Sequence, residues 1–193
     1  MKIIEKIVVR EWIELIPDPA FFREQDQKFF NNSDLPRVKD ELSITLRLRL
    51  QRPAYGWTSI FHKGTEEFIR TPGLWLTSKS ALHARFTGNW DNDAGIYEIG
   101  DGLLIQKWYH IAYTLSESKK RLDLYIDGEW IGFYSIQDVK KQCIIFNDGP
   151  LYIGQSFSAR GFNGEISNFR YFNWHLSADE IREEFESHVF LRH

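Results

Sequence analysis

The chain has 193 residues, of which 42% are hydrophobic and 26% charged, and its formal net charge is −3 at pH 7. This length favours a single domain with one buried core. A slightly negative chain lacks the basic field expected of a nucleic-acid-binding protein or a polybasic membrane anchor. Because no run of about 18 apolar residues occurs, membrane insertion is not predicted. Aromatic residues make up 16% of the chain, which favours strands and contact surfaces.

Two features bear on the compartment. Cys143 is the single cysteine of the sequence, so no internal disulfide can form and a reducing compartment is suitable. The N-terminal stretch MKIIEKIVVREWIEL carries Glu5 and Glu11 inside its apolar runs, and no signal peptide is predicted. The location stays unknown on this basis, with an intracellular one slightly favoured.

The first 40 residues are the least regular part of the chain. Residues Lys6 to Ile16 fit an edge strand, and the segment that follows is broken by Pro17, Pro19 and Pro36. We expect this segment to form a covering loop, although a short helix from Pro19 to Phe30 would also fit.

From Glu41 onwards the pattern indicates strands. ELSITLRLRLQ alternates strictly, with leucines and Ile44 on one face and Ser43, Thr45 and two arginines on the other, as in a half-buried strand. Turn signals then recur every 8 to 12 residues or so, which indicates an all-β sandwich or barrel. Further strands are predicted at 57–62, 74–77, 82–87, 108–115, 121–126, 129–135, 144–146, 151–153 and 164–173.

One hairpin can be predicted in register. In RLDLYIDGEWIGFY the pair Asp127-Gly128 is a type I′ turn signal. A two-residue loop would pair Ile126 with Glu129 and Tyr125 with Trp130. The same register would pair Leu124 with Ile131 and Leu122 with Phe133, with these four side chains on the core face.

The C-terminal region contains a helix start. Ser177 and Glu180 form a capping box, and Leu176 and Ile181 are placed as a hydrophobic staple. A helix from Ala178 to about His188 is expected, with Ile181, Phe185 and Val189 as candidates for its inner face.

Five cues in order resemble the laminin-G-like branch of the concanavalin A-like lectin/glucanase superfamily. They are FHKG (61–64), WYHIAYTL (108–115), LYIDGEW (124–130), LYIGQ (151–155) and GFNGEISNFRYFNWHLSADEI (161–181). The resemblance implies a jelly-roll β-sandwich of two antiparallel sheets with a short C-terminal helix. It implies one domain over 1–193, with an edge strand and covering loop in 1–40, the sandwich in 41–176 and the helix in 177–190.

The sequence does not predict an enzyme. Sandwich-type glucanases of the superfamily carry an E-x-D-x-x-E strand, because retaining hydrolysis needs two carboxylates about 5 Å apart. The nearest pairs here are Glu66-Glu67, Asp91 with Asp93, and Asp123 with Asp127, and none has this spacing on one strand.

A metal site has one candidate in the sequence. The six histidines are scattered without an HExxH or HxH pair, so zinc is not expected, and His110 is expected to have a structural role. Many family members bind Ca²⁺ at rim loops, but the acidic run of the pentraxin-like relatives is missing after Gln155. The remaining candidate for Ca²⁺ is the loop TGNWDNDAG, through Asp91 and Asp93.

The same loop is the first candidate for ligand binding. Trp90 lies in a polar loop with no evident core to fill, and Asn89, Asp91 and Asp93 stand beside it. Second choices are two further aromatic pairs, Tyr55 with Trp57 and Tyr125 with Trp130.

Three functions remain open at this point. The first is a non-catalytic module that binds a carbohydrate or glycoconjugate through rim loops. The second is a structural or protein-interaction subunit of a larger assembly, which the absence of a signal peptide and of disulfides favours. The third is a degenerate glycoside-active enzyme. The partner is accordingly a glycan or a protein.

Overall fold

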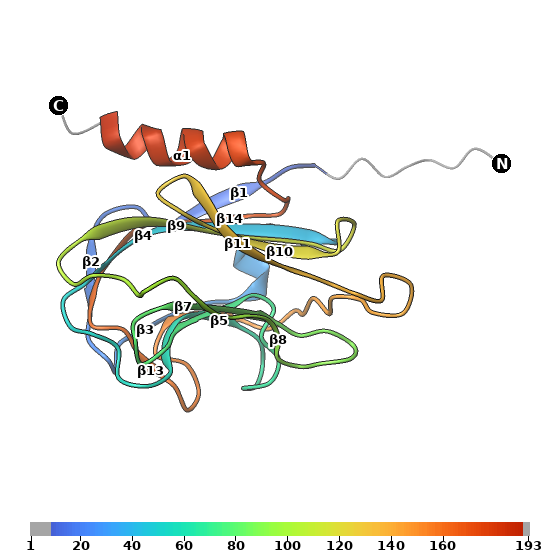
Figure 1. Cartoon of the computed structure of the whole chain (residues 1–193), viewed down its shortest axis with the longest axis horizontal. Coiled ribbons are helices and arrows are strands. Elements are labelled where there is room, and N and C mark those ends of the chain that lie inside the picture. The colour runs from blue at the N-terminus through green and yellow to red at the C-terminus, as the bar shows by residue number, and fades with distance from the viewer. Residues whose placement is uncertain (1–8, 191–193) are drawn as a thin grey trace.

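The computed structural model describes residues 9–190 and consists of two packed β-sheets with one helix on the outside (Figure 1). Both sheets are antiparallel except where the short strand β13 runs parallel to β5. Sheet A has the order β1 (Trp12–Ile16), β14 (Gly164–Phe172), β4 (Glu41–Leu50), β9 (Trp108–Ser116), β10 (Arg121–Ile126), β11 (Glu129–Ser135), and β2 (Ala20–Phe22) also pairs with β14.

Sheet B is the second layer and faces sheet A across the core. Its order is β3 (Gln27–Phe30), β12 (Leu151–Gly154), β5 (Thr58–Lys63), β6 (Gly73–Leu76), β7 (Leu82–Phe86), β8 (Ala94–Ile99), and β13 (Arg160–Gly161) also pairs with β5. A 3-10 turn η1 (Asn32–Asp34) follows β3, and α1 (Ala178–Phe190) ends the described chain. The prediction of an all-β sandwich with a C-terminal helix is confirmed.

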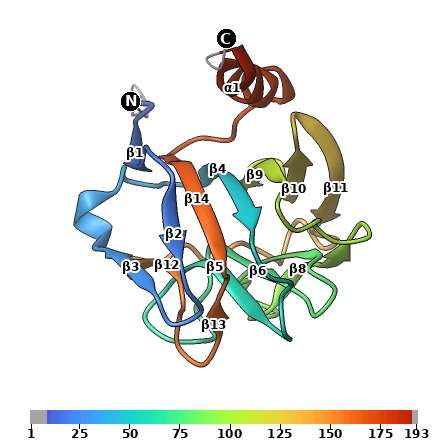
Figure 2. The same cartoon turned by 90° about the vertical axis from the view of Figure 1, so that its left-hand side faces the viewer.

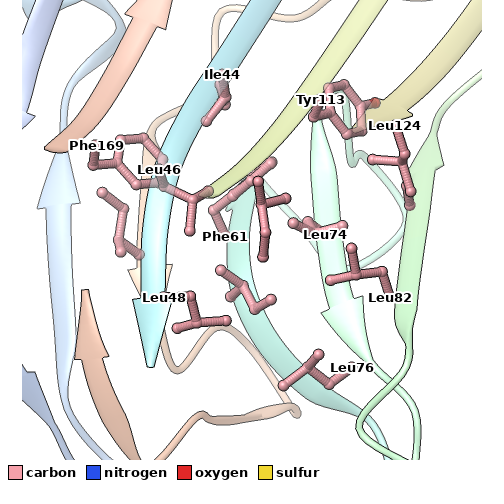
Figure 3. Packing of buried hydrophobic residues seen from close by; sticks show 14 of the residues in the cluster. Ile44, Leu46, Leu48, Phe61, Leu74, Leu76, Leu82, Tyr113, Leu124 and Phe169 are labelled. Carbon is pink, nitrogen blue, oxygen red and sulfur yellow. The ribbon is translucent and has the colours of Figure 1, made fainter. Parts of the chain in front are cut away.

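The core lies between the sheets. On β4 the predicted alternation is confirmed, since Leu42, Ile44, Leu46, Leu48 and Leu50 are all buried against the facing sheet. Figure 3 shows three of them opposite Phe61, Leu74, Leu76 and Leu82 from sheet B. Residues two apart on a strand share a face, so a single leucine pattern in the sequence supplies a large part of this core.

The outer face of sheet A is covered by α1 and the segment before it (Figure 2). Ile181 and Leu176 pack with Tyr125 and Phe172 in a second, smaller apolar cluster. The capping box is formed as predicted, because the Glu180 N–H donates to Ser177 Oγ (3.1 Å) and the Ser177 N–H donates to Glu180 Oε2 (2.7 Å). On the last turn, however, His188 is buried and Val189 is exposed.

This cover changes the environment of β4. Its second face was expected to contact solvent, yet Ser43 and Thr45 are fully buried. Ser43 Oγ donates to the carbonyl oxygen of Trp174 (2.8 Å), and the Leu176 N–H donates to Ser43 Oγ (2.9 Å). The polar positions of the strand therefore hold the C-terminal segment in place.

Two predictions for strands and helices are wrong. The segment 19–30 is not a helix but the strands β2 and β3, because sheet edges at β14 and β12 accept them and Phe22 enters the core. Residues 144–146 form no strand and contribute one isolated bridge, between Ile144 and Gly88. The expected edge strand is confirmed over Trp12–Ile16; its first residues, 6–8, lie outside the described residues.

The predicted register of the hairpin is confirmed next to the turn and is wrong for the residues beyond Trp130. Asp127 and Gly128 both have positive φ, as a type I′ turn requires, and Tyr125 pairs with Trp130. A bulge then shifts the register, so that Leu124 pairs with Gly132, and Phe133 points to solvent instead of the core. A bulge adds one residue to one strand and reverses the faces beyond it.

Candidate functional site

A cavity of about 470 Å³ opens on the outer face of sheet B, the face that points away from sheet A. Its floor is formed by His62 of β5, Trp75 of β6 and His83 of β7. Each of these alternates with core residues such as Leu74 and Leu82, so its side chain must point outward. The pairing of Trp75 with His83 across β6 and β7 places the two rings side by side.

Aromatic rings form one wall of this cavity. The rings of Trp57 and His83 lie 4.4 Å apart between centroids, and Tyr97 from β8 meets Trp57 edge to face at 5.7 Å. Trp57 and Tyr97 remain exposed, as does Tyr55 in the loop before β5. Large exposed rings around a concave surface are typical of a ligand-binding site.

A second wall of the cavity carries hydrogen-bonding side chains in fixed positions. The Asp93 carboxylate accepts from Arg70 Nη1 (3.0 Å) and from Arg85 Nε (2.9 Å). The Arg70 guanidinium also lies over the Trp75 ring, 5.2 Å from its centroid. Glu67 accepts a hydrogen bond from Ser158 in the loop after β12. The wall is thus held by side chains from three separate segments.

Both histidines of the floor are neutral near pH 7. Burial, with a smaller contribution from the charge of Arg70, lowers the pKa of His62 to about 4. Its Nε2 donates to the carbonyl oxygen of Ile69 (2.7 Å). Burial also lowers the pKa of His83, whose Nδ1 donates to the carbonyl oxygen of Tyr97. This tautomer leaves Nε2 of His83 as an acceptor.

In the structure, the ligand-binding residues predicted from the sequence lie in three separate places. Tyr55, Trp57 and Asp93 line the cavity. Trp90 packs against the core beside Phe86 and leaves no room for a Cβ at Gly88. The premise that Trp90 has no core to fill is therefore wrong, while its contact with a ligand stays a prediction.

The polar residues beside Trp90 have structural partners. Asn89 exchanges hydrogen bonds with the chain at Lys141 and Cys143. Asp91 Oδ1 accepts from the Asp93 N–H (2.9 Å). Two guanidinium groups already occupy the Asp93 carboxylate, which disfavours a cation there. Calcium binding by Asp91 and Asp93 stays a prediction.

Within residues 9–190, the ionisable side chains grouped closely enough to hold a metal ion lie elsewhere, on the outer face of sheet A. They are His110, Glu184 and His188. The search of the sequence for HExxH and HxH pairs missed them. The one local signal is Glu184-x-x-x-His188, which places two side chains on the same face of a helix.

The remaining predicted pair lies on sheet A, away from the cavity. Tyr125 is buried under α1. Trp130 is exposed, donates from Nε1 to Asp123 Oδ1 (2.9 Å) and stacks on Phe133. Burial disfavours the charged form of Asp123, but the nearby His175 ring and hydrogen bonds from Arg121 and Trp130 outweigh it and hold its pKa at about 2.

Comparison with protein families gives one match, over residues 23–182, to a model described as the concanavalin A-like lectin/glucanases superfamily. No curated protein sequence matches significantly. Between residues 9 and 190, no helix is long and apolar enough to cross a membrane.

Solved structures with the same fold have low sequence identity. The chain aligns with the binding domain of botulinum neurotoxin serotype D (TM-score 0.68, 13% identity), covering 94% of this chain and 47% of that one. It aligns with Trypanosoma rangeli sialidase (TM-score 0.60, 17% identity), covering 79% of this chain and 23% of that one. The same sialidase in complex with sialic acid gives a TM-score of 0.58 at 18% identity, over 79% of this chain and 24% of that one. The chain therefore spans about a quarter of the sialidase and about half of the toxin domain.

Proposed function

The chain belongs to the concanavalin A-like lectin/glucanase superfamily, and on that premise we propose that it is a non-catalytic module that binds a neutral oligosaccharide. The observation that carries the proposal is the cavity on sheet B, where exposed aromatic rings face fixed polar side chains. Aromatic faces stack on the C–H surfaces of sugars, and planar polar groups bind their hydroxyls. Loops contribute to this cavity together with the sheet, through residues 55–57, 67–70 and 156–160.

The charge of the cavity favours a neutral sugar. Its lining contains two arginines, Arg70 and Arg160, and two carboxylates, Glu67 and Asp93. The histidines of the floor are uncharged near pH 7, so the charges of the lining cancel. A sugar carboxylate would find the guanidinium of Arg70 already bound to Asp93.

The same side chains argue against hydrolysis. Retaining and inverting glycosidases both need two carboxyl groups facing the scissile bond. The two carboxylates of the cavity are engaged by other side chains, Glu67 by Ser158 and Asp93 by Arg70 and Arg85. We expect no release of reducing sugar from any oligosaccharide that binds, measured over hours at high protein concentration.

One of the structural relatives supports a recognition role, because it is a neurotoxin binding domain. Its identity to this chain is 13%, so the ligand has to follow from the cavity of this chain. A glycan array with neutral, sulfated and sialylated members tests which class of glycan binds. Calorimetry with the best hit then gives the affinity.

A matched pair of variants locates the site. Trp57 and Trp130 are similarly exposed, at 49% and 51%, but Trp57 lies just before β5 of sheet B and Trp130 lies on β11 of sheet A. Trp57→Ala should weaken binding by at least about 30-fold, roughly 2 kcal/mol, whereas Trp130→Ala should leave it unchanged. An array without hits, or equal losses in both variants, would contradict the proposal.

A second function is favoured by one observation. Phe21 and Phe29 in the N-terminal segment are both about half exposed, although Phe22 between them is buried. Exposed phenylalanines suit protein docking in a larger assembly. Co-purification of a defined partner that is lost in Phe21→Ser and Phe29→Ser, but kept in Trp57→Ala, would favour this function over glycan binding.

A further inference from the structure

A cluster of metal-ligating side chains lies between sheet A and α1, on the side of the molecule opposite the sugar-binding cavity. His110 comes from β9, and Glu184 and His188 come from successive turns of α1. One possible ligand atom from each lies within 4.8 Å of the other two. The His110 and His188 rings are 5.7 Å apart between centroids.

His110 is unusual among the buried polar residues. Its side chain is 2% exposed, and neither Nδ1 nor Nε2 has a hydrogen-bond partner among the described residues. A buried polar group without a partner costs about 1–3 kcal/mol and calls for an explanation such as an ion. His110 thus offers two ring nitrogens, of which one can bind a metal.

The Glu184 carboxylate is held in a fixed position by its hydrogen bonds. Arg170 Nη1 (2.8 Å) and Thr45 Oγ1 (3.4 Å) both donate to Oε2 of Glu184, so these bonds fix the carboxylate and use one of its oxygens.

The surrounding charges allow a cation to enter. Arg170 is bound by Glu14 as well as by Glu184, and Asp127 accepts from the His110 N–H (2.8 Å). Two carboxylates, those of Glu14 and Glu184, thus pair with the guanidinium of Arg170 and compensate its charge. A neighbouring cavity of about 440 Å³, lined in part by His110 and His188, provides a path and room for a water ligand.

We propose that His110, Glu184 and His188 bind a divalent transition-metal ion, with Zn²⁺ the best match. Two imidazoles and one carboxylate form a donor set that Zn²⁺ prefers, with ligand distances of about 2.0–2.2 Å. Tetrahedral geometry at these distances puts ligand atoms roughly 3.3–3.6 Å apart, so side chains whose ligand atoms now lie within 4.8 Å of one another must close by at most about 1.5 Å on binding. Because the ligands join a strand to the helix, the ion clamps α1 onto sheet A.

The test uses the untagged full chain, because a histidine tag binds the same ions. Calorimetry with ZnCl₂ should give one site per chain, and Co²⁺ should give the intense visible absorption of four- or five-coordinate cobalt. Zn²⁺ should also raise the melting temperature and slow hydrogen exchange in α1, since it binds only the folded site. No binding, or a purely octahedral cobalt spectrum, would overturn the proposal.

Three variants assign the ligands. His110→Phe and Glu184→Gln should each weaken Zn²⁺ binding by about 100-fold or more. This loss exceeds the 10–100-fold loss of affinity that is typical when a residue that only hydrogen-bonds to a metal ligand is changed. His83→Gln removes a histidine on the other sheet and should leave the affinity for Zn²⁺ unchanged. Glu184→Gln alters a helix side chain, so it remains informative if His110→Phe fails to fold. Unchanged binding in Glu184→Gln and in any folded His110→Phe would place the metal elsewhere and overturn the proposal.

Discussion

The two outer faces of the sandwich start from the same strand alternation and end differently. Sheet A turns its outer face toward α1, which buries Ser43, Thr45 and Tyr125 and forms a second apolar cluster. Within residues 9–190, no helix covers β5, β6 and β7 of sheet B, and the outward rings of Trp57 and Tyr97 stay exposed around a cavity. One helix at the end of the chain therefore decides which face becomes structural and which stays available to a ligand.

The largest expected effect tests whether α1 is part of the fold. Ile181 is fully buried in the cluster under the helix, whereas Val189 on the last turn is 46% exposed. Ile181→Ala should lower the free energy of unfolding by about 3 kcal/mol, because it leaves a cavity, and Val189→Ala should change it by less than about 0.5 kcal/mol. Urea unfolding followed by Trp fluorescence measures both. A loss below about 1 kcal/mol in Ile181→Ala would mean that sheet A does not depend on its cover.

The next effect concerns the open face and is a dependence on pH. The pKa of His62 is about 4 in the fold and about 6.5 when unfolded. The unfolded chain therefore binds the proton first, and the contribution of neutral His62 is complete above pH 6.5 and lost as the pH falls toward 4. The loss amounts to about 3 kcal/mol.

His62→Gln keeps a donor for the Ile69 carbonyl and cannot titrate. Its unfolding free energy should fall less between pH 7 and pH 4 than that of the wild type, by up to about 3 kcal/mol. Denaturant titrations at four pH values measure the difference. Identical pH profiles would show that protonation of His62 does not limit the stability of the open face.

A smaller effect is expected at the start of α1. Ser177→Ala removes the oxygen that accepts from the Glu180 N–H, which should cost about 1 kcal/mol. Ser187→Ala serves as the control, because Ser187 is an exposed serine on the same helix whose hydroxyl donates to the Glu184 carbonyl oxygen. Thermal unfolding should separate the two variants. Equal melting temperatures of the two variants would show that the Ser177 cap does not stabilise α1.

The smallest effect is expected for calcium at the rim of the open face. Arg70 and Arg85 already bind the Asp93 carboxylate, so the melting temperature of the metal-free protein should be the same with and without added Ca²⁺. Asp91→Asn keeps the acceptor for the Asp93 N–H and should behave like the wild type in both conditions. A rise with Ca²⁺ that disappears in Asp91→Asn would restore the calcium site predicted from the sequence.

Local patterns were sufficient for much of the fold. The alternation on β4, the Asp127-Gly128 turn and the capping box of α1 each depend on a few neighbouring residues. The bulge after Trp130 was not predictable, because the extra residue is accommodated by packing against the facing layer. The same holds for β2 and β3, whose formation depends on free sheet edges elsewhere in the chain.

The candidate site was only partly predictable, for a related reason. Tyr55, Trp57 and Asp93 were identified as polar or aromatic residues near loops. His62, Trp75 and His83 were missed, because each occupies an outward strand position that looks ordinary by itself. The packing of Trp90 against the core was missed, since a polar loop sequence does not indicate whether its one large ring turns toward the core.

The sequence by itself determined the strand pattern, the helix start and the membership of a sandwich family, because these depend on residues close together in the chain. Only the tertiary structure decided which rings meet on sheet B and which histidines meet under α1. Those encounters are set by the register between strands and by the docking of the helix. Both are governed by the packing of whole layers and not by any short segment.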